Sequence, residues 1–329
     1  MAMTLAEMKV GMSDKVASQI VDIFLRESEI LQLLPFDNCV SPQGGSTLTY
    51  SYVQKKLPSV AAFRALNAEY TANQATVEKK SADLKIFGGS FEIDRVLKEA
   101  EGPFNNMAYQ IKEKVLAAIS LFHYTLINGN GTTTATEFDG LDKMLTGTTS
   151  EFNTASVIDI STMANLKTNA DQLYEALQLL IKNTDADALL MNAAMIAKVQ
   201  TMARILGYKT ESEEAFGRKV TSMDGVRFMN LGNHYTVSGS AVTANSCVKA
   251  GISRTVGTAQ TGIADIYAVK FDVNDGFHAA SLTGNSAIRH YLPDFNSPGA
   301  VKKGEVEMVA ATVLKNTAHA GVLRNIKIA

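Results

Sequence analysis

The sequence has no tryptophan and only two cysteines among its 329 residues. Cys39 and Cys247 lie far apart and form no CxxC spacing, which predicts two reduced, buried thiols rather than a metal site or a disulfide. No apolar run approaches the about 20 residues that cross a bilayer. The N-terminus also lacks the basic head and apolar core of a signal peptide. We therefore expect a soluble, cytoplasmic protein without a membrane partner.

An excess of charge of one sign is lacking as well. The chain carries 31 Lys and Arg against 33 Asp and Glu, a formal net charge of −2. Tight binding to bare nucleic acid needs a concentrated cationic face, and this balance does not suggest one. Hydrophobic residues make up 46% of the chain and charged residues 19%, which is typical of a globular protein with one large domain or two modest ones.

Motifs for catalysis and cofactor binding are missing too. There is no HExxH or GxSxG, and the five histidines are scattered at positions 123, 234, 278, 290 and 319. Gly129-Asn130-Gly131 follows a predicted helix instead of opening one, so it reads as a helix stop and not as a phosphate loop. We predict no catalytic residue, no metal site and no cofactor. Distant residues can still meet in space, so an enzyme remains an alternative.

What is present begins with a long helix. Pro103 suits a first helical position, and Gly129 and Gly131 supply the stop. About 24 helical residues would span about 36 Å. Periodicity alone favours an ordinary core helix. Its apolar face repeats every three or four residues and consists of Phe104, Met107, Ala108, Ile111, Val115, Ala118, Ile119, Phe122 and Leu126.

A long two-stranded excursion precedes this helix. Thr47–Val53 alternates and is rich in strand-forming residues, and Thr76–Phe87 predicts a returning strand that ends before Gly88-Gly89. A polar segment rich in small residues, Lys55–Ala75, lies between the two strands. The span from Tyr50 to Phe87, folded in half, would reach roughly 60 Å at about 3.3 Å per residue. Because an isolated hairpin is marginal in water, it either folds back on the body or rests on another subunit.

Opposite charges gather in two stretches. The excursion carries six basic residues against three acids, and residues 137–159 carry five acids against Lys143 alone. A solvated face is the ordinary explanation for such runs. The alternative is head-to-tail contact between copies. The predicted intersubunit residues are Lys55, Lys56, Arg64, Lys79, Lys80 and Lys85 on the excursion, and Glu137, Asp139, Asp142 and Glu151 in the acidic stretch, which also contains Asp159.

The remaining pattern predicts mixed helix and strand. The first helix starts at Ser13 and ends near Glu27, packed either on its own core or on a neighbour. The later elements are a helix capped by Thr168, a strand Ala188–Met191, a helix capped by Asn192 and stopped by Gly207, a turn Met223–Val226 before a strand, a strand Ile263–Phe271, and terminal strands Val306–Leu314 and Val322–Ile328 joined near His319–Gly321.

The order of these features resembles the major capsid proteins of tailed bacteriophages with the HK97-type fold. The resemblance is carried by SEILQLLPF, the excursion Thr47–Phe87, the helix from Pro103, and the pairing INGNG at 127–131 with FDGL at 138–141. It covers essentially the whole chain. It implies an α+β fold with an N-terminal arm (1–45), an extended E-loop hairpin (46–95), a P domain with a long spine helix (96–168), an α/β A domain (169–290) and C-terminal strands returning to the P domain (291–329).

The resemblance also implies a function. In the family, pentamers and hexamers assemble into an icosahedral shell around double-stranded DNA, and the E-loop lies across the adjacent subunit. The expected location is the virion capsid, assembled in the host cytoplasm. The expected partners are the chain itself, a portal, decoration proteins, a separate scaffolding protein, and packaged DNA held by weak, non-specific contact. An encapsulin-like compartment with protein cargo and a soluble α/β enzyme are the alternatives.

Two departures from the family pattern shape these expectations. The chain begins a few residues before the arm, so we expect a separate scaffolding protein or none. Some members join an E-loop lysine to an asparagine on a late strand with the help of a glutamate. Here that strand reads GEVEMVAATVL, with Glu305 and Glu307 but no asparagine, and with Ala310-Ala311-Thr312 where the glutamate is expected. We therefore predict no covalent crosslink.

Overall fold

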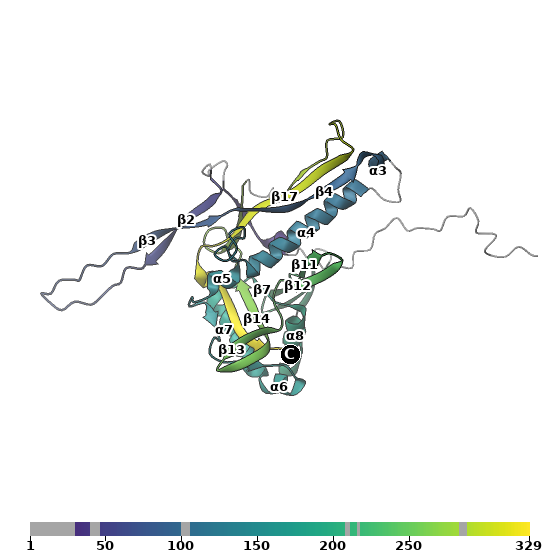
Figure 1. The fold of residues 1–329 in the computed structure, drawn as a ribbon. Coiled ribbons are helices and arrows are strands. Elements are labelled where there is room, and N and C mark those ends of the chain that lie inside the picture. The colour runs from purple at the N-terminus through teal and green to yellow at the C-terminus, as the bar shows by residue number, and fades with distance from the viewer. Residues whose placement is uncertain (1–29, 40–46, 100–105, 208–210, 216–217, 283–287) are drawn as a thin grey trace, which may run out of the picture.

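A computed structural model describes residues 30–39, 47–99, 106–207, 211–215, 218–282 and 288–329. The predicted helix from Ser13 to Glu27 and the predicted helix start at Pro103 lie outside these residues. The described elements form a body with two main sheets, and a two-stranded hairpin extends from one side of it (Figure 1).

The long helix is α4 (Asn106–Asn128), which packs against the strands β4 (Lys85–Asp94) and β17 (Val301–Leu314). Its C-terminal half is the better buried, with Phe122 and Leu126 fully enclosed. The predicted face is confirmed there, and the helix ends directly before Gly129 as expected. Figure 1 shows α4 running beside the β4–β17 ribbon along much of its length.

Steric constraints explain why glycine occupies positions 129 and 140 in the INGNG and FDGL segments. The chain crosses itself there, and the Gly140 amide donates to the Gly129 carbonyl at 2.9 Å. A Cβ atom on Gly129 would lie 2.3 Å from the Phe138 carbonyl oxygen, and one on Gly140 would lie 2.6 Å from that of Ile127. Only glycine permits this close approach of two backbones.

Strand β17 organises the first sheet. It pairs with β4 along one side, and β15 and β16 follow one another along its other side, with β1 beyond β15. The predicted strand Thr76–Phe87 is wrong as a single element. It divides at the buried Leu84 into a strand of the hairpin and β4, and β4 continues through Gly88 and Gly89 because it is paired with β17. The remaining strands are β1 (Phe36–Asn38), β15 (Phe277–Ser281) and β16 (Ile288–Tyr291).

The second sheet has nine strands and separates two hydrophobic cores. Along β7 (Ala188–Leu190), Ala188 and Leu190 face the core shared with α4, whereas Leu189 faces the core shared with the helices of the other side. Burial on both faces explains why its central strands are almost continuously apolar. The other strands are β5 (Glu151–Phe152), β6 (Ile158–Asp159), β8 (Glu211–Ala215), β9 (Arg218–Met223), β10 (Val226–Met229), β13 (Ile252–Val256), β14 (Thr258–Val269) and β18 (Ala320–Lys327).

The predicted α/β unit is confirmed around β7. Helix α8 (Ala193–Leu206) is capped by Asn192, whose side chain accepts from the Met195 amide at 2.9 Å, and it ends at Gly207. The turn at Asp224-Gly225 before β10 is also confirmed. The other helices and short elements are α2 (Ile30–Leu33), α3 (Arg95–Glu99), α5 (Leu141–Leu145), α6 (Met163–Thr168), α7 (Ala170–Thr184), η1 (Thr317–His319) and the hairpin β11 (Asn233–Ser238) with β12 (Ala241–Ser246).

Three local predictions need correction. Thr168 does not cap α7, because it is the last residue of α6, and Asn169 occupies the cap position. The predicted strand Ile263–Phe271 is β14, which starts earlier because it forms a hairpin with β13. The two terminal strands exist, but they belong to different sheets and are connected through η1.

Candidate intersubunit surface

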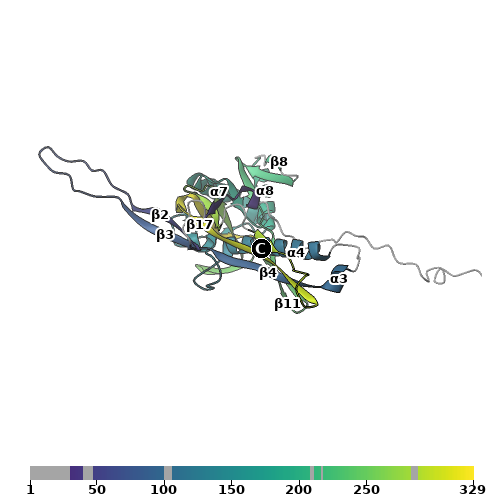
Figure 2. The same cartoon turned by 90° about the horizontal axis from the view of Figure 1, so that it is seen from above.

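The hairpin that leaves the body consists of β2 (Thr49–Leu57) and β3 (Thr76–Asp83). Its ladder runs from Thr49–Asp83 to Leu57–Thr76, and residues 58–75 continue beyond it as an extended tip. Both views show the hairpin projecting well clear of the two main sheets (Figures 1 and 2). The predicted excursion is therefore confirmed as a projecting element, and residues 58–75 are exposed throughout.

The base of the hairpin is bound to the body by one of its faces. The Tyr50 hydroxyl donates to Asp37 at 2.6 Å, the Tyr52 hydroxyl to the Leu314 carbonyl at 3.1 Å, and Gln54 to the Lys315 carbonyl at 2.9 Å. Burial alone would raise the pKa of Asp37, but the hydrogen bonds from Tyr50 and the Asn38 amide, together with nearby positive charge, outweigh burial and lower that pKa. The hydrogen-bonded base therefore ends near Gln54.

Beyond Gln54 the two faces of the hairpin differ. Lys56 and Lys80 lie on the face of the body-binding residues and pair with Glu78, at 3.8 and 2.7 Å. Val53, Lys55, Val77 and Lys79 lie on the opposite face, where the register sets each lysine beside a valine of the other strand. Val53 and Val77 are 70% and 67% exposed. Among the described residues, neither Lys55 nor Lys79 forms an ion pair.

The tip is ordered by its own contacts. The Asn73 side chain accepts from the Val60 amide and donates to the Val60 carbonyl, both at 2.8 Å, in the manner of a β-bridge. Arg64 donates to the carbonyls of Ala65 and Ala68 across the intervening turn. Its guanidinium also lies 5.5 Å from the centre of the Tyr70 ring. These contacts all lie within the tip, and none of them involves the body.

The tip displays large apolar side chains to solvent. Phe63 and Leu66 are 107% and 89% exposed, and Val60 and Tyr70 are exposed beside them. Large exposed apolar side chains gathered in one short segment are typical of interaction surfaces. The sequence reading emphasised the basic residues and described this segment as polar. The spacing of Phe63, Leu66 and Tyr70 was the signal that could have identified it.

The predicted acidic residues have partners within their own chain. Glu137 accepts from the Asn130 amide at 3.2 Å, and Asp139 accepts from the Gly131 amide at 2.9 Å and from Lys143 at 2.7 Å. Both carboxylates therefore hold together the crossing between the INGNG and FDGL segments.

The other two acids, Asp142 and Glu151, bind Arg324 on β18. This arginine donates to Glu151 at 2.8 Å, to Asp265 at 2.9 Å and to Asp142. The side chains of Arg324 and Asp265 are only 5% and 2% exposed. Sequence reasoning missed both residues, because no local pattern shows that β14 and β18 are neighbours.

The charges of this network balance one another. Burial alone would raise the pKa of Asp265, but the hydrogen bond from Arg254 and the charge of Arg324 lower it. Arg254 binds both carboxylate oxygens of Asp265, at 3.1 and 2.8 Å. A buried charge is tolerated only when it is paired and hydrogen-bonded, and each acid here meets that condition. The network joins the segment after α4 to the nine-stranded sheet.

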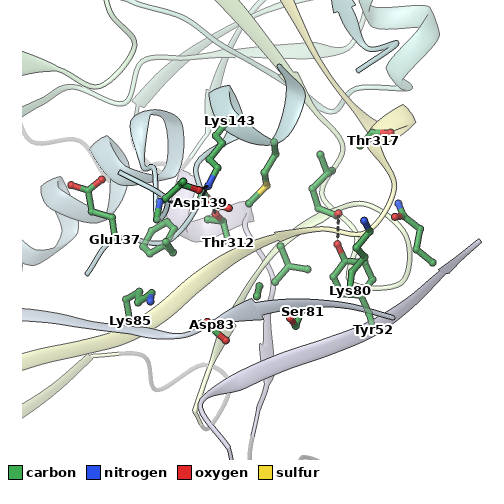
Figure 3. A pocket seen from close by; sticks show the side chains of 18 residues that line it. Tyr52, Lys80, Ser81, Asp83, Lys85, Glu137, Asp139, Lys143, Thr312 and Thr317 are labelled. Atoms are coloured by element: carbon green, nitrogen blue, oxygen red, sulfur yellow. Dashed lines mark hydrogen bonds and ion pairs between the residues drawn. The ribbon is translucent and has the colours of Figure 1, made fainter. Parts of the chain in front are cut away.

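A cavity of about 540 Å³ brings members of both predicted charge groups together in one chain. Figure 3 shows Lys80, Asp83 and Lys85 along one side and Glu137, Asp139 and Lys143 along the other. Lys85 lies in β4, outside the hairpin, and donates to the Ala135 carbonyl at 2.9 Å. Whether any of the predicted charged residues touches a neighbouring copy stays a prediction.

Other kinds of site find little support in the described part of the chain. No cluster of three or more His, Cys, Asp or Glu side chains there has the arrangement to hold a metal ion. None of the helices in the described ranges is both long and apolar enough to cross a bilayer. Cys39 and Cys247 are free and buried, as predicted.

Comparison with solved structures identifies the architecture. The holo-SrpI encapsulin complex of Synechococcus elongatus PCC 7942 matches with a TM-score of 0.63 and 12% identity, over 100% of this chain and 97% of that one. The capsid of a native GTA particle matches with a TM-score of 0.62 and 11% identity, over 98% of both chains. The capsid of the Myoviridae phage XM1 matches with a TM-score of 0.57 and 14% identity, over 98% of this chain and 99% of that one.

The chain has the HK97-type fold. No protein-family profile matches the sequence, and no curated protein sequence matches it. In the terms of the HK97-type fold, the β2–β3 hairpin with its tip is the E-loop and α4 is the spine helix. The fold class predicted from sequence is therefore confirmed, and residues 58–75 of the E-loop are all exposed.

Proposed function

We propose that this chain is the structural subunit of an icosahedral shell, the capsid of a tailed-bacteriophage virion, in which pentamers and hexamers enclose double-stranded DNA. The observation that carries the proposal is the E-loop beyond Gln54. It leaves the body, forms its hydrogen bonds within its own tip and exposes Phe63 and Leu66. An apolar surface of this kind is stabilised when a partner covers it. In this proposal the partner is another copy of the same chain.

The charge balance supports the same proposal. A net charge of −2 suits a wall that encloses DNA through weak, non-specific contacts. The partners in this proposal are other copies of the chain, a separate scaffolding protein, a portal and decoration proteins. Assembly takes place in the host cytoplasm, and the chain acts as structure and not as an enzyme.

A second candidate is a compartment shell around protein cargo. The similarity to an encapsulin complex is as high as that to the GTA capsid, with TM-scores of 0.63 and 0.62. Both candidates are protein shells, and they differ in whether the shell encloses DNA or protein cargo. A soluble α/β enzyme is the remaining alternative, and it requires a stable small monomer.

The test is to express the full chain and examine it by sedimentation and negative-stain electron microscopy. Closed shells support the proposal, whereas a small monomer at high concentration contradicts it. Nuclease-protected DNA inside shells made in infected or prophage-bearing cells supports a capsid. Copurifying protein cargo without DNA supports the compartment.

The double variant Phe63→Asp/Leu66→Asp tests the observation that carries the proposal. It should remove assembled particles and leave the subunit folded, because neither side chain packs on its own body. Phe36→Asp, on β1 within the body, is the contrasting variant and should impair folding itself. Normal shells from the double variant would show that the E-loop tip takes no part in the assembly contact.

A further inference from the structure

A loop ends the β4–β17 ribbon at the side opposite the E-loop. This ribbon-tip loop consists of residues 292–300, between β16 and β17, and lies beside α3 (Figure 1). Most of its residues are exposed, and so are its neighbours Val96 and Leu97 on α3 and Val301 on β17, by 65%, 60% and 54%. The loop therefore projects into solvent next to exposed apolar side chains.

The second residue of β17, Lys302, is buried although it is a lysine. The residue is only 4% exposed. Asp265 and Arg324 are buried as well, but they pair with each other at 2.9 Å. Lys302 has no carboxylate at ion-pair distance in the part of the chain that the structure describes. A buried charge without a counter-ion is costly unless hydrogen bonds replace the lost water.

The ribbon-tip loop supplies those hydrogen bonds. The Lys302 ammonium donates to the Ser297 carbonyl, to the Ser297 hydroxyl at 3.0 Å and to the Pro298 carbonyl at 3.1 Å. An ammonium has three N–H donors, so these three oxygens use all of them. The Ser297 hydroxyl in turn donates to the Asp294 carbonyl at 2.9 Å. The three oxygens form an ammonium cage that joins the loop to β17.

This arrangement serves the position of the loop more than the stability of the ribbon. A methionine has nearly the same length as a lysine and would be buried at position 302 without the cost of desolvating a charge. A methionine would not bind Ser297 and Pro298, however. Hydrogen bonds from a charged donor are about twice as strong as neutral ones. The lysine therefore fixes an exposed loop at the expense of a buried charge.

We propose that Lys302 is a positioning residue for shell assembly, whose ammonium fills the cage of Ser297 and Pro298 oxygens and holds the ribbon-tip loop in the conformation that assembly requires. The proposal rests on the proposed shell function and adds a residue that orders part of the subunit beforehand. Ordering the loop in advance lowers the entropy cost of association. The cage also accepts a free primary ammonium ion when the lysine is shortened.

The first test is Lys302→Met in the full chain, read by sedimentation and electron microscopy. It should lower the yield of shells by about tenfold or more, the effect of losing one hydrogen bond to a charged group. The unfolding free energy of the unassembled subunit should stay the same or rise. The matched control is Lys303→Met, which removes the same charge from the exposed neighbour and should retain assembly.

The second test asks for the ammonium itself. Lys302→Ala empties the cage, and n-propylammonium has the same three carbons and nitrogen that the substitution removes. Adding it should restore shells in proportion to its concentration. Tetramethylammonium carries the same charge without an N–H donor and is the control. Equal rescue by both ions, or rescue by neither in a folded subunit, overturns the cage.

Hydrogen exchange of the unassembled subunit measures the loop directly. In Lys302→Met the amides of residues 294–300 should exchange faster, whereas those of β17 that pair with β4 should keep their protection. Unchanged exchange in the loop contradicts the proposal.

Ser297→Ala covers the case in which the Lys302 variants do not fold. Ser297 is exposed, and the substitution removes one oxygen of the cage. It should lower the yield of shells, whereas Asn296→Ala, at the exposed position beside it, should not. Equal yields from these two variants also contradict the proposal.

The outcomes separate this inference from the proposed function. If the wild-type chain forms no shells, the proposed function fails, and hydrogen exchange still decides whether Lys302 fixes the loop. If the wild type forms shells and Lys302→Met assembles equally well, only the role of Lys302 is overturned.

Discussion

The segment after α4 and the E-loop both concentrate charge, and they use it in opposite ways. The acids of the segment after α4 are bound by Arg324, Lys143 and backbone amides, and through Arg324 they join this segment to the nine-stranded sheet of the same subunit. On the E-loop, one face pairs its lysines with Glu78, and the other leaves Lys55 and Lys79 without a partner in the described chain. Charge alone therefore does not separate residues that hold the subunit together from residues available to a neighbour; burial and partners do.

The largest effect should come from removing Arg324, the cation that binds the acids of the segment after α4. Arg324→Met leaves the buried carboxylate of Asp265 with Arg254 and the Asn325 amide as partners, and it removes the partner of Glu151. Losing one partner of a buried charge network costs about 3–5 kcal/mol, and urea unfolding of the unassembled subunit measures it. Arg204→Met, on the exposed side of α8, is the control and should change the unfolding free energy little. A loss below about 1 kcal/mol from Arg324→Met would contradict the network's structural role.

The stability of the subunit should depend on pH through a buried histidine at the base of the E-loop. His278 lies beneath Tyr50 at the base of the E-loop, where burial, helped by the charge of Lys315, lowers its pKa from 6.5 to about 4. Between those pH values the unfolded chain binds a proton that the folded chain does not, so the unfolding free energy falls as the pH falls. One pKa unit corresponds to about 1.4 kcal/mol, so the total is on the order of 3 kcal/mol.

Thermal unfolding of the subunit at pH 7, 6, 5 and 4 measures this dependence. His278→Phe should flatten part of it, and the remainder includes His123, whose burial also lowers its pKa to about 4. His290→Phe on β16, an exposed position, is the matched control and should leave the slope unchanged. An unaltered slope in His278→Phe would assign the pH dependence to other groups.

The smallest effect is expected at the E-loop tip, and it is measured by comparing an exposed phenylalanine with a buried one. Phe63 is fully exposed at the E-loop tip, and Phe122 is fully buried on α4. Phe63→Ala should change the unfolding free energy of the unassembled subunit by less than about 0.5 kcal/mol, as surface substitutions do. Phe122→Ala should cost about 3–5 kcal/mol. A large loss from Phe63→Ala would mean that the tip packs on its own body.

Much of the fold was accessible from local pattern. The period of α4, its stop at Gly129, the cap at Asn192 and the turn at Asp224-Gly225 each depend on neighbouring residues, and each is confirmed. The errors lie where pairing with a distant strand overrides the local signal. Gly88 and Gly89 look like an end, yet ladder bonds to β17 carry β4 through them.

The candidate surface was accessible only in part. The length and alternation of the E-loop predicted an element that leaves the body, and its basic residues were visible at once. Which lysines pair with Glu78 and which face outward depends on the strand register, and one residue of shift exchanges the two faces. The partner of Asp142 and Glu151 is Arg324 on β18, which lies 182 and 173 residues away from them in sequence.

The sequence by itself determined the long helix α4, the helix α8 with its cap, the turn at Asp224-Gly225 and the projection of the E-loop, since these follow from periodicity and from contacts within a few residues. Only the tertiary structure decided which charges are bound within the subunit, because a carboxylate's partner is set by which strands become neighbours. The same long-range pairing decided that β4 and β17 form a ribbon with a hollow above Gly88. The hollow at Gly88 exists only because two distant strands have been brought together.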